Sequence, residues 1–150
     1  MSLVLTLLMA CTPDNEISRR STTDVFSQEP LSEVDILWVV DDSNSMAEEQ
    51  LLVADGFEAF ISTLAETNID FHVGVVSTDM DLSNPNRGVL IGNPGVLTAD
   101  TPNYVSKFAS RVQVGVDGSD KEKGLAASIA ALSEPLVSGA NEGFLRPDAH

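Results

Sequence analysis

Residues 34–40, with the sequence VDILWVV, constrain the fold more than any other part of the chain. They are almost continuously apolar and rich in β-branched side chains, and charged residues bound them at Glu33 and Asp41. Strands that are apolar on both faces are typical of parallel sheets with helices on both sides. The run therefore predicts a central, buried strand in an α/β domain.

A helix and a second strand are predicted directly after this run. Residues 69–77 (IDFHVGVVS) repeat the buried-strand pattern, and strand, helix and strand fall within about 45 residues, the size of a βαβ unit. We expect residues 34–150 to form one α/β domain, a Rossmann-like, doubly wound sheet with helices on both faces. The helix is predicted over 46–66, where the apolar face consists of Val53, Phe57, Phe60, Ile61 and Leu64.

The remainder of the domain gives weaker patterns. Residues 79–104 are rich in turn-forming residues, and the short apolar pieces at 89–91 and 96–97 predict either an edge hairpin or an elaborated loop. Residues 104–116 are ambiguous. A helical pattern returns at 120–133, where one stripe consists of Leu125, Ile129 and Leu132.

The charge balance excludes one class of partner. The 150 residues include 23 Asp and Glu against 8 Lys and Arg, a formal net charge of −15 at pH 7. Binding of nucleic acid needs a basic face that neutralises phosphates, and this chain cannot supply one. The acidic surface is compatible with divalent cations, basic partners or plain solubility.

The N-terminus has the features of an export signal. Residues 1–11 are apolar and too short to span a bilayer, as in the apolar core of a secretory signal. Leu8-Met9-Ala10-Cys11 resembles the bacterial lipobox, in which the cysteine is lipidated and becomes the new N-terminus. Because the segment has no Lys or Arg, either the true start lies upstream or the signal is untypical. The alternative is a buried apolar strand with an incidental free thiol.

Residues 12–33 predict a flexible linker, since they are rich in Thr, Ser, Asp and Glu and include Pro13 and Pro30. A linker after a lipidated Cys11 would hold the domain away from the membrane. We therefore expect an exported lipoprotein of the bacterial cell envelope, at the outer membrane or the surface, anchored to the membrane through Cys11. The single cysteine excludes an intrachain disulfide and a Cys-rich metal site.

The residues that indicate chemistry are Asp41, Ser43 and Ser45, which follow the first strand and open the first helix. Ligands of open α/β sheets bind in this position, at the carboxyl ends of the strands. One carboxylate and two hydroxyls on a tight loop are hard oxygen donors, which suit Mg²⁺ or Ca²⁺ rather than Zn²⁺. The loop therefore predicts a divalent-cation site.

A purely structural role is the alternative for the same loop. Ser45 and Glu48 have the spacing of a capping box, so Ser45 could only cap the helix. Asp41 and Ser43 could be turn residues at the end of the strand.

The segment VDILWVVDDSNSM is similar to the start of von Willebrand factor type A domains. The resemblance covers residues 33–148, with FHVGVVSTD following at the family's spacing. It implies a metal-ion-dependent adhesion site in which Ser43 and Ser45 bind the cation directly and Asp41 acts through a water molecule. It also implies Mg²⁺, with Ca²⁺ or Mn²⁺ as alternatives, and a protein or peptide carboxylate as the bound partner.

The resemblance includes a third loop, but the last ligand of the family's site has no counterpart in this sequence. In GVDGSDKEKGL, Ser119 occupies the position of the family's threonine ligand, although Ser119 and Glu122 also have capping-box spacing. The family's further Asp, at the end of a later strand, has no counterpart after Leu136. We therefore expect a domain that is incomplete at its C-terminal end, with exposed strand edges, and weak or absent cation binding.

We expect an adhesion-type binding module rather than an enzyme. Two other functions are alternatives to this module. ILWVVDDS also resembles the acidic pair of two-component receiver domains, but Asp79 lacks the context of a phosphoacceptor. A metal-dependent hydrolase would have only Asp42 as a general base, and we expect Asp42 to face solvent or a backbone amide. A third alternative is a von Willebrand factor A remnant that binds no metal. His72 is expected to be a strand residue without a partner.

Overall fold

The computed structural model describes residues 33–66, 69–119 and 121–149. The predicted export signal, Cys11 and almost all of the predicted linker lie outside these residues. The elements in chain order are β1 (Glu33–Val40), the 3-10 turn η1 (Asn44–Met46), α1 (Ala47–Glu66), β2 (Asp70–Ser77), α2 (Tyr104–Val112) and α3 (Gly124–Ala131).

The two strands form a parallel pair joined by α1, as the spacing of the apolar runs predicts. The register runs from Glu33 opposite Asp70 to Val40 opposite Ser77. Parallel pairing brings the carboxyl ends of both strands to the same end of the sheet, so the loops that follow β1 and β2 meet there. The mixed α/β class is confirmed, with a sheet of two strands in the described residues.

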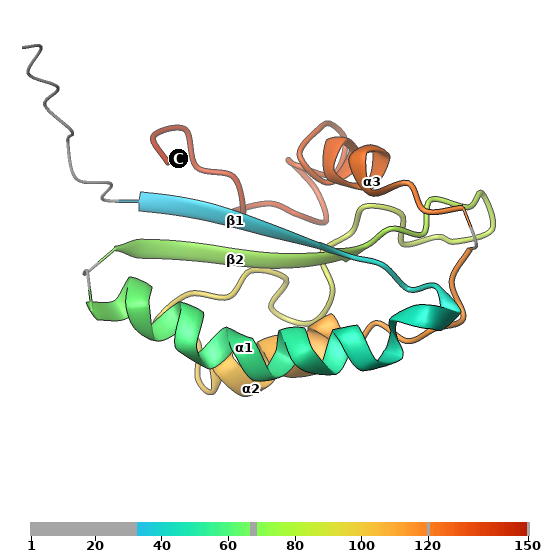
Figure 1. The fold of residues 1–150 in the computed structure, drawn as a ribbon. Helices are drawn as coiled ribbons and strands as arrows, with labels where there is room; N and C mark the ends of the chain where they lie inside the picture. The colour runs from blue at the N-terminus through green and yellow to red at the C-terminus, as the bar shows by residue number, and fades with distance from the viewer. Residues whose placement is uncertain (1–32, 67–68, 120, 150) are drawn as a thin grey trace, which may run out of the picture.

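One face of the sheet packs on α1 and α2 (Figure 1). The even-numbered residues of β1 lie on this face together with the odd-numbered residues of β2 from Phe71 to Val75. Its centre is aromatic: the Phe57 and Phe108 rings stack with centroids 3.4 Å apart, and Trp38 meets Phe108 edge-on at 5.2 Å. This cluster joins the first strand to both helices.

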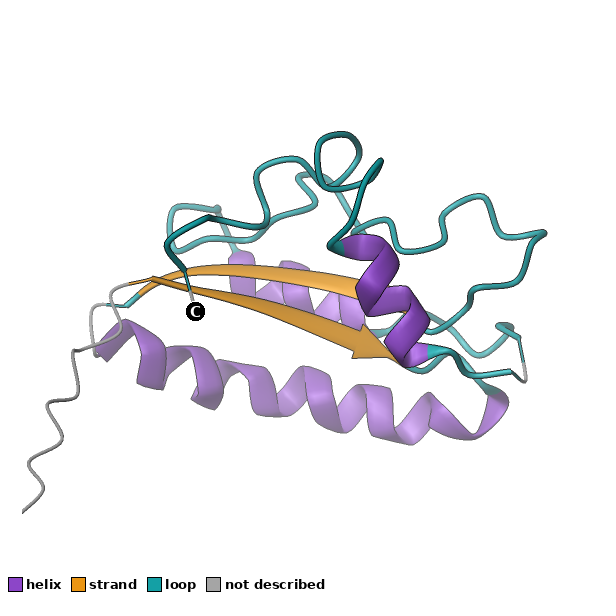
Figure 2. Cartoon of the chain, turned by 90° about the horizontal axis from the view of Figure 1, so that it is seen from above, coloured by secondary structure: helices purple, strands orange, loops and turns teal. Residues whose placement is uncertain are grey.

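The opposite face packs on α3 and on loops (Figure 2). The buried side of α3 consists of Ala127 and Ala131, which pack with Val76 and Phe144. The stripe of larger side chains in this helix is exposed instead, with Leu125 at 77%. The small alanines allow α3 to lie close to the sheet, and the sheet in the described residues leaves the larger side chains uncovered.

The outer edge of β2 is covered by residues 89–97. The Ile91 amide donates to the Val75 carbonyl, and Val73 forms a single antiparallel bridge with Leu97. Of the two alternatives for this segment, the structure has the loop rather than a regular hairpin. The ambiguous residues before Gly115 contain α2, in which Arg111 is buried and donates to the Gly95 carbonyl at 3.0 Å.

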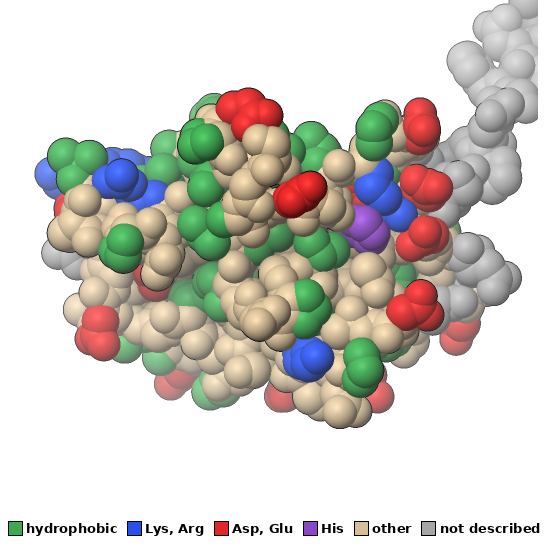
Figure 3. Space-filling model, turned by 180° about the vertical axis from the view of Figure 1, so that it is seen from behind, with side chains coloured by type: hydrophobic (Ala, Val, Ile, Leu, Met, Phe, Trp, Pro, Cys, Tyr) green, Lys and Arg blue, Asp and Glu red, His purple; other side chains and the backbone are tan. Residues whose placement is uncertain are grey.

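An ion cluster holds the C-terminal segment on the amino ends of the strands. Arg146 donates to the buried Asp35 carboxylate at 2.8 Å and also pairs with Asp70 and Glu33. Burial lowers the pKa of Arg146, but the hydrogen bond and charge of Asp35, followed by the charges of Asp70 and Glu33, raise it overall. Figure 3 shows acidic, basic and histidine side chains gathered on this side of the molecule.

The prediction for His72 is wrong in one respect, because the side chain has partners. Its Nδ1 lies 3.0 Å from the Phe144 carbonyl oxygen and 3.8 Å from Asp35. His72 shares a face with Asp35 because the two are register partners. Within the described part of the chain, no helix is long and apolar enough to cross a membrane.

Replacing Phe108 by alanine should lower the free energy of unfolding by about 3–5 kcal/mol, because the side chain is fully buried against Phe57 and Trp38. Urea unfolding followed by circular dichroism measures the change. Leu82→Ala is the control, since Leu82 is 90% exposed and should change stability by less than about 0.5 kcal/mol. Equal effects of the two substitutions would contradict the assigned core.

Candidate metal centre

The candidate site lies where the loops after β1 and β2 meet a third loop, residues 115–119. Gln50 of α1 connects two of these loops, since its Nε2 donates to the Asp41 carbonyl at 2.8 Å and to the Gly115 carbonyl at 2.9 Å. The side chain is 3% exposed. The structure thus brings the third loop to the predicted metal loop.

The three predicted ligands of the first loop lie together. The Oγ atoms of Ser43 and Ser45 are 3.5 Å apart, and Asp41 Oδ1 accepts from the Ser43 amide at 2.8 Å. This Asx turn closes the loop directly after the strand. Asp41 Oδ2 has no hydrogen-bond partner among the described residues.

The predicted capping boxes are not formed. Ser45 lies inside η1, and its hydroxyl pairs with Ser43 rather than with a helix amide. Ser119 Oγ accepts from the Lys121 amide at 3.2 Å, while α3 begins only at Gly124, with Lys123 as its N-cap and no side-chain cap. The alternative in which these serines are only helix caps is therefore wrong for both.

Asp42 differs from its predicted environment. Its side chain is buried, and its carboxylate accepts from the Ser77 hydroxyl at 2.6 Å and the Thr78 hydroxyl at 3.4 Å. Solvent and a backbone amide are therefore not the partners of this carboxylate. Ser77 ends the neighbouring strand and Thr78 follows it, so the parallel register brings both hydroxyls to the residue that follows β1. The carboxylate joins the two strand ends.

The backbone of Asp42 and its carboxylate also fix the third loop. The Gly118 amide donates to the Asp42 carbonyl at 3.0 Å, and a Cβ at Gly118 would overlap the Asp42 carboxyl group. Only a glycine allows this approach of the two loops. Ser119 follows Gly118 directly, so it lies beside the first loop, although no described hydrogen bond joins it to Ser43 or Ser45.

The loop after β2 that carries Asp79 and Asp81 is a tightly hydrogen-bonded turn. Asp79 Oδ1 accepts from the Asp81 amide, and Asp79 Oδ2 from Asn84 at 3.1 Å. The backbone amide of Ser83, and then its hydroxyl, donate to Asp81 and lower the pKa of that carboxyl group. These carboxylates support a turn, and no hydrogen bond among the described residues joins them to Asp41, Ser43 or Ser45.

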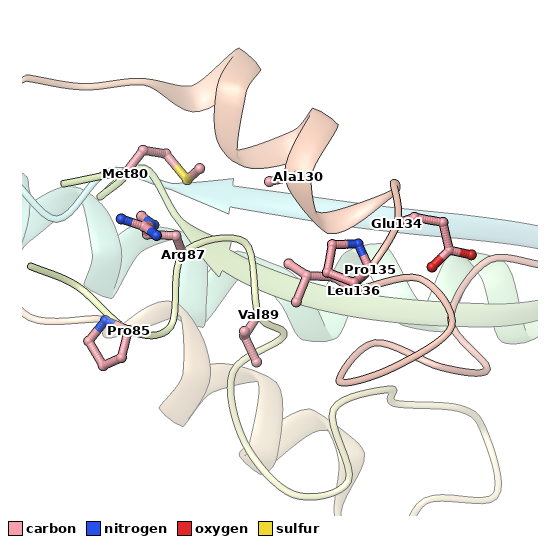
Figure 4. Close-up of a pocket in the computed structure, with 8 residues that line it drawn as sticks. All are labelled: Met80, Pro85, Arg87, Val89, Ala130, Glu134, Pro135 and Leu136. Atoms are coloured by element: carbon pink, nitrogen blue, oxygen red, sulfur yellow. The ribbon is translucent and has the colours of Figure 1, made fainter. Parts of the chain in front are cut away.

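One hollow in the described structure borders the candidate site, and a larger one lies away from it. A cavity of about 310 Å³ lies between the 80–89 loop and the end of α3, with Arg87 and Glu134 at its borders (Figure 4). A second cavity of about 220 Å³ lies between β1 and α1 and is bordered by Asp41. The first hollow therefore belongs to a different part of the surface from the serines.

Among residues 33–66, 69–119 and 121–149, no three His, Cys, Asp or Glu side chains gather closely enough to hold a metal ion. A cation at the loop after β1 would thus depend on hydroxyls and one carboxylate. These are the hard oxygen donors that Mg²⁺ and Ca²⁺ accept.

No protein-family model matches the chain, and no similar curated protein or solved structure is found. The assignment of the candidate site therefore rests on the positions and hydrogen bonds of its residues alone.

Replacing Gly118 by alanine should destabilise the fold by about 1–3 kcal/mol, because the added methyl group would push the third loop away from Asp42. Chemical denaturation measures the loss. Gly56→Ala is the matched control, since Gly56 lies at an exposed position of α1 with no atom near its missing Cβ. This substitution should raise the free energy of unfolding by about 0.5–1 kcal/mol. A neutral Gly118 variant would contradict the close approach of the loops.

Replacing Ser83 by alanine should raise the pKa of Asp81, which should stay below its ordinary value because the backbone hydrogen bond remains. Because the folded-state pKa is lowered, this turn stabilises the fold above the ordinary aspartate pKa, and the contribution is lost as pH falls through the lowered pKa. Carboxyl NMR titration measures both values. An unchanged Asp81 pKa in the variant would show that the hydroxyl contributes nothing.

Proposed function

We propose that this chain carries a von Willebrand factor A-like module that binds a divalent cation at the loop after β1 and captures a carboxylate of a protein or peptide. The proposed fold is the doubly wound sheet of that family, of which the βαβ unit and the helices on both faces form the described part. Asp41, Ser43 and Ser45 are the first-loop ligands, and Ser119 is the third-loop ligand.

The observation that carries the proposal is the convergence of the Ser43 and Ser45 hydroxyls, 3.5 Å apart, just past the carboxyl end of β1. Neither hydroxyl caps a helix. Two exposed or half-buried hydroxyls held side by side without a structural task are available to a ligand. The free Oδ2 of Asp41 adds a charged oxygen to the same loop.

The donor set explains the proposed choice of cation and partner. Hydroxyl and carboxylate oxygens favour Mg²⁺, Ca²⁺ or Mn²⁺ over softer metals. With Asp42 occupied by Ser77 and Thr78, a single carboxylate supplies the charge on this loop. A cation with so few anionic ligands remains electrophilic and accepts a carboxylate from a partner. The same shortage of charge predicts weak binding.

The burial of Asp42 speaks against the receiver-like alternative, which needs an available acidic pair after the first strand. It is compatible with the other alternative, a module of this family that binds no metal. Cell-envelope attachment through Cys11 remains part of the proposal and agrees with capture of an external partner.

Calorimetric titration of the full chain with Mg²⁺, Mn²⁺ and Ca²⁺ tests the site. We expect saturable binding with a Kd on the order of 10⁻⁴–10⁻³ M, as in modules with few charged ligands. Ser43→Ala and Ser45→Ala should each weaken binding about tenfold or more, since each removes a direct ligand.

Ser62→Ala is the matched control, because the Ser62 hydroxyl is exposed on α1 and only bonds to the Glu58 carbonyl. The control should bind like the unchanged chain. Binding that is equally strong in all four proteins would place the cations elsewhere on the acidic surface and contradict the site.

A further inference from the structure

Gln50 is a polar residue on the buried face of α1. Val53 and Phe57 follow it by three and seven residues, so the three side chains share one face of the helix. Val53 and Phe57 pack in the core, and Gln50 itself is 3% exposed. A polar group buried in this way needs hydrogen-bond partners. The partners of Gln50 therefore indicate its role.

Both protons of the Gln50 amide nitrogen are used. A primary amide has two donors, and Nε2 donates to the Asp41 carbonyl at 2.8 Å and to the Gly115 carbonyl at 2.9 Å. The first carbonyl belongs to a proposed cation ligand, and the second lies at the beginning of the loop that contains Ser119. Figure 1 shows the beginning of α1 beside the segment that precedes α3. One side chain therefore connects two loops that carry proposed ligands.

The third loop depends on this bond at its beginning. Gly115 is exposed, and a Cβ added to it would meet no atom within 4 Å. Its φ of 91° lies in the left-handed region, which glycine adopts without strain. Packing therefore does not hold the loop at Gly115. Further along the loop, the Gly118 amide donates to the Asp42 carbonyl, and this backbone bond does not involve Gln50.

We propose that Gln50 is a positioning residue of the cation site. It holds the third loop where the Ser119 hydroxyl reaches the cation that the first loop binds. Gln50 acts through the loop and is not itself a ligand. The inference rests on the proposed function, because it assigns a role within the same site. Without the two hydrogen bonds, the first loop keeps its three ligands and the cation loses Ser119.

A double-mutant cycle on the Mg²⁺ affinity of the full chain tests this role. Gln50→Met replaces the amide by a flexible apolar side chain and removes both donors. It should weaken Mg²⁺ binding about tenfold, as does the loss of a residue that orients a ligand. Ser119→Ala should weaken binding to a similar extent. The double variant should bind about as weakly as either single variant, because Gln50 acts through Ser119.

Gln113→Met is the matched control. Gln113 is exposed at the end of α2, and its Nε2 donates to the Ala109 carbonyl of the same helix at 2.8 Å. This variant should bind Mg²⁺ like the unchanged chain. Gly115→Ala is a second variant, which disturbs the same attachment from an exposed position of the loop and leaves the buried face of α1 intact. It should also weaken binding about tenfold.

NMR amide signals at saturating Mg²⁺ distinguish displacement of one loop from general destabilisation. In the unchanged chain, Mg²⁺ should shift the signals of Ser43, Ser45 and Ser119. In Gln50→Met and Gly115→Ala, the shift at Ser119 should be lost and the other two should remain.

Two results would overturn the role of Gln50. One is additive weakening, about a hundredfold in the double variant. The other is a Ser119 shift that persists in both loop variants, Gln50→Met and Gly115→Ala. Absence of Mg²⁺ binding by the unchanged chain would instead contradict the proposed function, and this inference with it.

Discussion

The parallel pairing of β1 and β2 is the constraint on which the rest of the described structure depends. Because the strands run in the same direction, α1 must cross the sheet between them, and both following loops emerge at one end. The same pairing gives the sheet two apolar faces, which α1 and α2 cover on one side and α3 on the other. A one-residue slip in register would remove Ser77 and Thr78 from Asp42 and separate the loops.

Asp42 converts that register into a defined loop arrangement. Its carboxylate accepts from the end of β2, and its carbonyl accepts from Gly118 of the third loop. A buried carboxylate must be satisfied by hydrogen bonds. Asp42 therefore joins its own loop to the end of β2 through its carboxylate and to the third loop through its carbonyl. This internal role leaves Asp41, Ser43 and Ser45 on the accessible side. One acid therefore organises the candidate site, and its neighbour is available to a ligand.

The sequence predicted β1, α1, β2 and the first loop because their apolar periodicity is strong. It did not reveal α2, since the buried Arg111 interrupts the apolar face of that helix. It also indicated the wrong apolar stripe for α3, because Ala127 and Ala131 form the buried face of this helix and its larger apolar residues are exposed. The role of Asp42 depends on hydroxyls from another strand, and two adjacent aspartates look alike without that register. The hydroxyls that follow β2 were the available signal.

A cation at the Ser43–Ser45 loop can be distinguished from cations spread over the acidic surface. Mn²⁺ added below stoichiometry to the isotopically labelled chain makes the distinction, since paramagnetic broadening of NMR signals reports distance from the ion. We expect the amide signals of Ser43, Ser45 and Ser119 to broaden first and added Mg²⁺ to restore them. Broadening that starts at Asp79 and Asp81, or along the acidic residues of α1, would contradict it.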